Sequence, residues 1–188
     1  MTTDPIRDKR QLKDLAGYWL ERGNFRNYLL IVLGVCTALR ISDLLRLRWA
    51  DVYDFDAEAW RSHLTITEGK TKKKRVIALN KKALYALGLC FATKRGVFLF
   101  VNNRKNAAAI SRIQAWRVIK DAARAVKAAG RVAAHSLRKT AGYLAYKNGV
   151  SSVMLMRIFN HASFEDTKRY IGITQEEQDE VYLALDVF

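Results

Sequence analysis

Hydrophobic positions recur with a helical period along most of the chain. Residues 7–20 place apolar side chains on one face, and residues 25–38 are apolar almost all round, which predicts a buried central helix. Capping residues and glycines at the ends of further periodic segments predict the remaining helices. They are a short helix capped by Ser42 and helices near residues 81–93, 111–129, 136–148, 152–159, 163–170 and from 175 onward.

The period changes between about residues 49 and 80. Residues 63–67 and 75–79 alternate like short strands and are separated by Gly69 and a basic stretch, which predicts a hairpin. The expected fold class is therefore mainly α with a small three-stranded antiparallel β-sheet at one edge. A length of 188 residues without a Ser/Gly-rich linker fits one domain, 1–188, whose residues 174–188 form an acidic and apolar tail helix.

Composition and charge narrow the class of protein. No apolar run approaches the roughly 20 residues of a membrane span, and residues 1–5 lack a signal-peptide pattern, so a cytoplasmic protein is expected. Cys36 and Cys90 lie in apolar sequence without a C-x-x-C spacing, which indicates core packing. The net charge is +15, and every Lys and Arg lies at or before Arg169. Such a charge favours nucleic acid or an anionic membrane surface as partner.

Several kinds of catalytic site find no support in the sequence. The acidic residues are mostly isolated and the three histidines show no short ligand spacing, so neither a metal site nor a cofactor is expected. There is no G-x-x-x-x-G-K loop and no G-x-S-x-G elbow. If this chain breaks a phosphodiester bond, it has to stabilise the transition state with its own cations, for which arginine is well suited.

Two places in the sequence supply such cations. Arg40 follows the end of the 25–38 helix, where it either answers the helix dipole or binds a phosphate, and Asp43 is a candidate orienting partner for it. His135 and Arg138 lie three residues apart at the start of a predicted helix. An arginine at the positive end of a helix indicates that an anion binds there, although a surface His/Arg pair is the commoner explanation of this spacing.

A longer pattern contains both places. Leu39-Arg40-Ile41-Ser42-Asp43 is followed by Lys70-Thr71 before the 75–79 strand, then by His135-Ser136-Leu137-Arg138, and then by His161 with Tyr170 nine positions later. In this order the elements resemble the catalytic domain of the tyrosine recombinase (phage integrase) family, over residues 10–175. The departures are Ala38 and Asn160, each where the family usually has Gly, and Lys139 where it often has His. The family's N-terminal DNA-clamping domain is expected to be absent, as in an excised catalytic domain or a minimal recombinase of the fimbrial-switch type.

The resemblance implies a role for each residue. Tyr170 attacks the phosphate, Arg40, Arg138 and His161 hold the developing charge, Lys70 protonates the leaving oxygen, and His135 accepts or positions the tyrosine proton. Lys72 is the alternative to Lys70 as proton donor. Other tyrosines are conceivable nucleophiles, but none stands nine residues after a histidine: Tyr85, Tyr143, Tyr146 and Tyr182. The DNA contacts expected outside this set are Lys72, Lys73, Lys74, Arg75 and Lys139.

The resemblance also implies partners and a reaction. They are double-stranded DNA, three further copies of the chain in a homotetramer joined through the C-terminal helix, and accessory DNA-bending proteins, at the nucleoid and without a membrane. The reaction is site-specific strand exchange through a 3′-phosphotyrosine. Alternatives are relaxation of DNA by a type IB topoisomerase and a DNA-binding regulator that has lost cleavage. The tail helix has two possible positions, either folded back on its own domain or docked on a neighbouring one.

Overall fold

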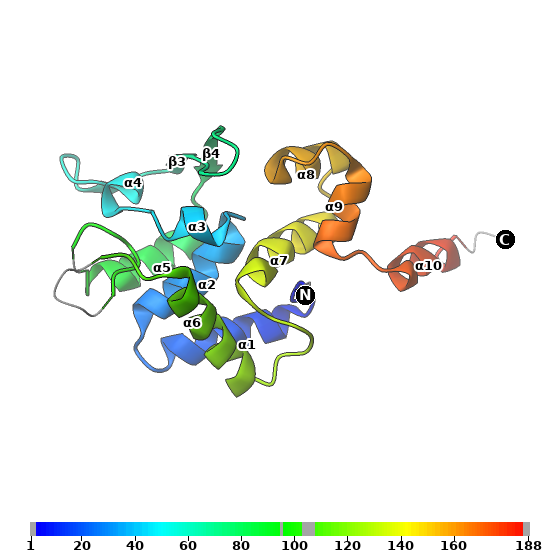
Figure 1. Ribbon diagram of the computed structural model, residues 1–188, viewed down its shortest axis with the longest axis horizontal. Coiled ribbons are helices and arrows are strands. Elements are labelled where there is room, and N and C mark those ends of the chain that lie inside the picture. The colour runs from blue at the N-terminus through cyan, green and yellow to red at the C-terminus, as the bar shows by residue number, and fades with distance from the viewer. Residues whose placement is uncertain (1–2, 95, 103–107, 186–188) are drawn as a thin grey trace.

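The computed structural model describes residues 3–94, 96–102 and 108–185, and these residues are mainly helical. The buried helix α2 (Phe25–Cys36) packs against α1 (Lys9–Leu20), α5 (Lys81–Phe91) and α7 (Ala134–Lys147) (Figure 1). The other helices are α3 (Ile41–Leu44), α4 (Trp49–Val52), α6 (Arg112–Ala125), α8 (Ser152–Phe159), α9 (Phe164–Ile171) and α10 (Gln175–Leu183). In the described part of the chain, every helix falls short of the length and apolar character that crossing a membrane requires.

The strands form two separate antiparallel pairs among the described residues. β1 (Tyr53–Asp54) pairs with β2 (Ala59–Trp60), and β3 (His63–Thr67) pairs with β4 (Lys74–Ala78) in a register that places His63 opposite Ala78. The expectation of a single three-stranded sheet is therefore wrong in strand arrangement, although the predicted hairpin is confirmed. The short β1–β2 pair was missed because two-residue strands are too short to show alternation.

The backbone conformation of residues 38–40 determines where α2 ends and α3 begins. The helix expected to reach residue 38 ends at Cys36, because Ala38 adopts a left-handed conformation with φ of 50°. Ser42 does not cap the next helix. Arg40 holds the N-cap position of α3 with an extended backbone, and Ser42 lies inside that helix. Arg40 is thus fixed at the junction of two helices, next to the buried Leu39.

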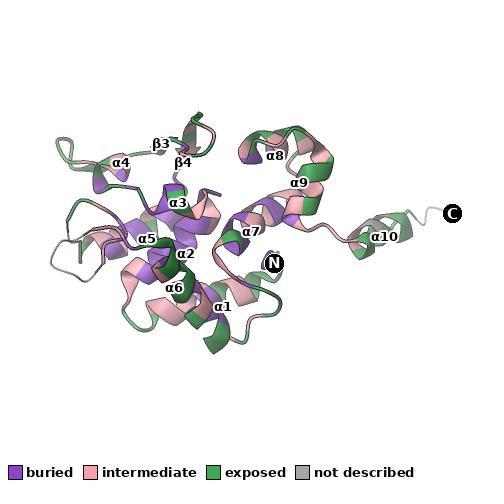
Figure 2. Cartoon of the chain, in the orientation of Figure 1, coloured by how far each residue is buried: buried purple, intermediate pink, exposed green. Residues whose placement is uncertain are grey.

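Helices α7, α8 and α9 form an arm beside the α1–α2–α5–α6 body, and the β3–β4 hairpin lies above that body (Figure 1). Phe159 of α8 and Ile171 of α9 are fully buried in the cluster that holds this arm together. The expected caps are confirmed: the side chains of Ser163 and Thr174 accept backbone N–H bonds at the starts of α9 and α10. Buried side chains concentrate on α2 and α7, whereas α10 extends away from the body with exposed residues (Figure 2).

Candidate active site

A cavity of about 330 Å³ lies where four segments of the chain converge. These are the start of α3, the turn between β3 and β4, the first turns of α7, and the α8–α9 connection with α9 itself. Its lining is Arg40, Lys70, Thr71, His135, Arg138, Phe159, Asn160, His161 and Tyr170. The structure therefore brings together all six residues that the sequence suggested for chemistry, across 130 positions of chain from Arg40 to Tyr170.

Arg40 has a different partner from the one expected. Its Nη1 donates to Oε2 of Glu68 at 2.7 Å, and Asp43 does not orient it. The buried Asp43 carboxylate instead accepts from Nη2 of Arg46 at 2.6 Å and from the backbone N–H of Gly69 at 2.9 Å. Asp43 thus secures the hairpin turn just before Lys70, and the arginine is held by a residue of the hairpin itself.

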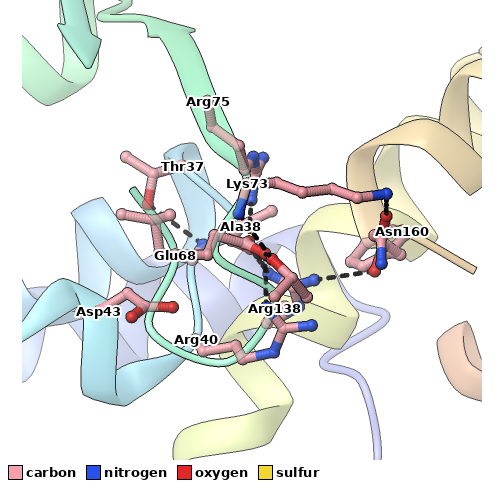
Figure 3. Close-up of polar contacts among 12 residues, drawn as sticks. Thr37, Ala38, Arg40, Asp43, Glu68, Lys73, Arg75, Arg138 and Asn160 are labelled. Carbon is pink, nitrogen blue, oxygen red and sulfur yellow. Dashed lines mark hydrogen bonds and ion pairs between the residues drawn. The ribbon is translucent and has the colours of Figure 1, made fainter. Parts of the chain in front are cut away.

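Glu68 lies at the centre of the polar contacts drawn in Figure 3. Its side chain is 2% exposed, and Oε1 is 3.1 Å from Nη1 of Arg75 and 3.9 Å from Nη1 of Arg138. Oε2 also accepts from the Thr71 hydroxyl at 2.6 Å. Burial acts to raise the pKa of Glu68, but hydrogen bonds from Thr71, Arg40 and Arg75 outweigh it and lower the pKa to about 2. The carboxylate is therefore charged at neutral pH.

Arg138 is buried in the first half of α7. Its Nη1 donates to the Ala38 carbonyl, Nη2 donates to the Phe159 carbonyl at 3.4 Å, and its guanidinium lies 5.0 Å from the centroid of the Phe159 ring. Burial lowers the pKa of Arg138, and Arg40 and Arg75 act in the same direction. The guanidinium remains a cation at neutral pH because an arginine starts from a pKa above 12. A buried cation that also lines the cavity provides a binding position for an anion.

Tyr170 and His161 face each other across the α8–α9 turn, with ring centroids 5.1 Å apart. Nδ1 of His161 is hydrogen-bonded to the Thr167 hydroxyl at 3.0 Å, which fixes the orientation of the ring. Burial raises the pKa of Tyr170, while Arg138 and Arg40 act to lower it. Burial and Arg138 lower the pKa of His161. The turn itself is made by Asn160 in a left-handed conformation, which asparagine tolerates better than most residues.

Lys70 and His135 lie at the mouth of the cavity, and both are exposed. The protein alone does not bury the side chain of Lys70. Its rival Lys72 is exposed in the hairpin turn and is not part of the cavity lining. Partial desolvation lowers the pKa of His135, and four cations lower it further: Arg138, Lys139, Arg40 and Lys70.

The residues expected to contact DNA divide into two groups. Lys72 and Lys74 are exposed on the hairpin, and Lys73, also exposed, donates from Nζ to Oδ1 of Asn160 and so joins the hairpin to the α8–α9 turn. Arg75 turns inward to Glu68, and Lys139 donates to the Thr3 carbonyl at 2.6 Å while lying 5.5 Å from the Tyr170 ring centroid. These last two therefore support the cavity as well as carrying positive charge.

Glu68 and Thr71 were missed by the sequence analysis. One signal was present, because Glu68 is the only acidic residue between Glu58 and Asp121 and it stands two positions before the basic run that starts at Lys70. Among the described residues, no group of three or more His, Cys, Asp and Glu side chains is placed to hold a metal ion.

A fold of this kind, with a tyrosine, two arginines, two histidines and a hairpin lysine around one cavity, defines the catalytic domain of tyrosine recombinases. The chain belongs to the phage integrase family, whose model matches residues 8–177. This confirms the resemblance noted in the sequence, and it supports a recombinase rather than a type IB topoisomerase.

The most informative relative is "Probable integrase/recombinase YoeC" of Bacillus subtilis, 38% identical over 181 residues, which cover 95% of this chain and 94% of that protein. Tyrosine recombinase XerA of Pyrococcus furiosus is 28% identical over 164 residues, 86% of this chain and 55% of that protein. The chain thus spans nearly all of YoeC and about half of XerA.

Solved structures agree in fold. The crystal structure of XerA recombinase matches with a TM-score of 0.76 at 21% identity, covering 97% of this chain and 64% of that one. XerH site-specific recombinase bound to a palindromic difH substrate matches with a TM-score of 0.75 at 18% identity, covering 96% of this chain and 53% of that one.

Proposed function

We propose that this chain cuts and rejoins DNA strands at specific sites, using the cavity at Tyr170 for a covalent phosphoryl transfer. The observation that carries the proposal is that Arg40, Arg138 and Tyr170 line one small cavity together with a lysine and two histidines. Phosphoryl transfer needs fixed cations around the non-bridging oxygens, a nucleophile and a proton donor for the leaving oxygen. The lining offers each of them.

In the forward step the Tyr170 oxygen attacks the scissile phosphorus and the bond to the 5′-oxygen breaks. Lys70 gives a proton to the leaving 5′-oxygen, and His135 takes the proton of the tyrosine hydroxyl. Arg40, Arg138 and His161 bind the non-bridging oxygens while charge builds on them. The products are a 3′-phosphotyrosine and a free 5′-hydroxyl. Because the phosphotyrosine keeps the ester bond, a 5′-hydroxyl from another strand can reverse the step without ATP.

The partners we propose are double-stranded DNA and three further copies of this chain at the nucleoid, with accessory DNA-bending proteins. The positive charge of the body suits DNA, and the structural neighbour XerH bound to difH substrate supports DNA as partner. A second neighbour, a lambda integrase tetramer bound to a Holliday junction, supports a multimeric assembly on DNA. The tail offers a surface for subunit contact. Tyr182 and Leu183 of α10 are 73% and 79% exposed in the single chain, which leaves them available to dock on a neighbouring copy.

A covalent-adduct assay tests the proposal without knowledge of the target site. The 188-residue chain is incubated with nicked duplexes that carry a randomised core, and protein-linked DNA is recovered after denaturation and sequenced. Wild type should yield adducts that enrich one core sequence, both with and without a chelator. Tyr170→Phe should bind the same DNA but form no adduct, whereas Tyr85→Phe, on an exposed face of α5, should behave as wild type. Adducts from Tyr170→Phe would refute the assignment.

A further inference from the structure

The buried Glu68 carboxylate connects separate walls of the cavity. Through Oε2 it binds Arg40, at the start of α3, and Thr71, the neighbour of Lys70 in the hairpin turn. Through Oε1 it binds Arg75 on β4 and faces Arg138 of α7 at 3.9 Å. The segments that carry the phosphate-binding cations and the proposed proton donor therefore share one anionic centre (Figure 3).

The Glu68 carboxylate also offsets the positive charge of the arginines around it. Arg40, Arg75 and Arg138 surround a single carboxylate that is 2% exposed, so three cations face one buried anion. Without it the guanidinium groups would repel one another, because like charges at close range in a poorly solvated site interact strongly. Among the described residues the Arg40 side chain makes its one hydrogen bond to protein with Glu68, so the direction of its remaining N–H donors depends on that contact.

The backbone of Glu68 also closes the turn that carries Lys70. Its N–H donates to the Lys73 carbonyl at 3.0 Å, and its carbonyl accepts from the N–H of Lys72 at 2.9 Å. The Thr71 hydroxyl then ties the middle of the turn to the side chain of the same residue. Lys70 itself is exposed, so its position is set by the turn and not by packing of its own side chain.

We propose that Glu68 is a positioning residue of the strand-transfer site. Its carboxylate orients Arg40 toward the phosphate and, through Thr71, holds Lys70 where it can protonate the leaving 5′-oxygen. The role of Glu68 rests on the proposed function of the chain. It adds to the site an acidic positioning residue that contacts neither the phosphate nor the nucleophile. One prediction separates this role from a contribution to folding. Removing the Glu68–Thr71 hydrogen bond should impair proton donation by Lys70 more than it impairs phosphate binding.

The test uses two variants and a control. Glu68→Gln keeps the shape of the side chain but removes its charge, and Thr71→Val keeps the volume but removes the hydroxyl. Asp54→Asn is the matched control, because Asp54 pairs with Arg61 at 3.1 Å on the β1–β2 side, outside the cavity. Each protein is assayed on the duplex enriched in the adduct selection, made with either oxygen or sulfur at the bridging 5′-position. A sulfur leaving group departs without a proton, so its cleavage does not need Lys70.

The measured quantity is the ratio of single-turnover cleavage rates, sulfur over oxygen. It should rise about tenfold or more in Glu68→Gln and Thr71→Val, since loss of positioning costs a general acid most of its advantage. The ratio should stay within about twofold of wild type in Asp54→Asn. A variant that had only lost stability would slow both substrates equally. An unchanged ratio in both variants would therefore overturn the proposal.

A second measurement does not depend on activity. Amide hydrogen exchange of DNA-free protein should be faster at residues 69–73 in Glu68→Gln and Thr71→Val than in wild type, and unchanged there in Asp54→Asn. If wild type forms no adduct with DNA, the proposed function fails. The exchange measurement still tests whether the Glu68–Thr71 hydrogen bond holds the turn in place. Unaltered exchange across the turn in both variants would contradict the Glu68 role even if adducts form.

Discussion

The protonation states of single residues in the cavity follow from the charges around them. Burial and neighbouring arginines lower the pKa values of His135 and His161, so both imidazoles are neutral at neutral pH. Burial raises the pKa of Tyr170, so this hydroxyl is protonated at neutral pH. His135 and Tyr170 line the same cavity, and a neutral histidine with a protonated tyrosine is the pair of protonation states that general base catalysis requires.

This arrangement predicts the pH dependence of cleavage. A histidine with a lowered pKa stays neutral to more acidic pH, so the base form is fully present above about pH 6.5, the ordinary histidine value, and is lost only below it. Single-turnover rates should therefore be flat from about pH 7 to 8 and should fall below about 6.5. His135→Asn should be slower and should lose much of this acid limb. An acid limb centred well above pH 6.5 would contradict the lowered pKa values.

At the scale of secondary-structure elements, the site depends on close packing of the α7–α8–α9 arm. Gly142 of α7 lies against Phe159 and Ile171, and a Cβ added there would be 2.5 Å and 2.6 Å from their side chains. Phe159 lines the cavity, and Ile171 follows Tyr170 directly. The absence of a side chain at this one position lets α8 and α9 approach the helix that carries His135 and Arg138.

Gly142→Ala should therefore lower the free energy of unfolding by about 1–3 kcal/mol, since overpacking outweighs the better helix propensity of alanine. Gly88→Ala in α5 is the control, because no atom lies within 4 Å of the position that its Cβ would take. It should raise stability by up to about 1 kcal/mol. Urea denaturation of both variants checks this, and a Gly142→Ala protein as stable as Gly88→Ala would show that the arm can shift freely.

The sequence predicted these elements with uneven success, for physical reasons. Helices such as α8 were placed correctly because periodicity and capping are local. The six proposed site residues, which line one cavity, could be singled out because each lies in a short motif. The partner of Arg40 was predicted wrongly, since Asp43 is near in sequence but Glu68 is near in space, 28 residues away. The end of α2 was missed because the left-handed conformation of Ala38 is imposed by packing and not by its side chain.

At the scale of the whole molecule, basic and acidic residues are separated along the chain. The basic body ends near Arg169, and the tail begins with Glu176 and Glu177. Glu177 anchors the start of α10: it accepts from the Tyr143 hydroxyl at 2.7 Å and pairs with Arg7 and Lys147. Tyr182 and Leu183 at the end of α10, and Leu185 just after it, are exposed. The rest of the expected tail surface, Asp186, Val187 and Phe188, lies outside the described residues.

The exposed apolar residues of α10 lead to a prediction about tetramer formation on DNA. Replacing Tyr182 and Leu183 with serine leaves the Glu177 anchor intact and removes exposed apolar surface, so fold and DNA affinity should be unchanged while tetramers on DNA are lost. Sedimentation of the protein with the enriched duplex measures this. Ile113→Ser is the control, because Ile113 is 64% exposed on α6 and has no proposed docking role. Tetramers that persist in the tail variant would show that these residues of α10 do not join the subunits.

In the proposed reaction Tyr170 becomes joined to DNA, and the cations of its own cavity stabilise the transition state. Mass spectrometry of the adduct tests it most directly, after nuclease and protease digestion of a reaction run with excess chelator. We expect a nucleotide linked through its 3′-phosphate to the peptide that contains Tyr170, in undiminished yield. A nucleotide on any other residue, a 5′-phosphate linkage, or loss of the adduct on chelation would contradict it.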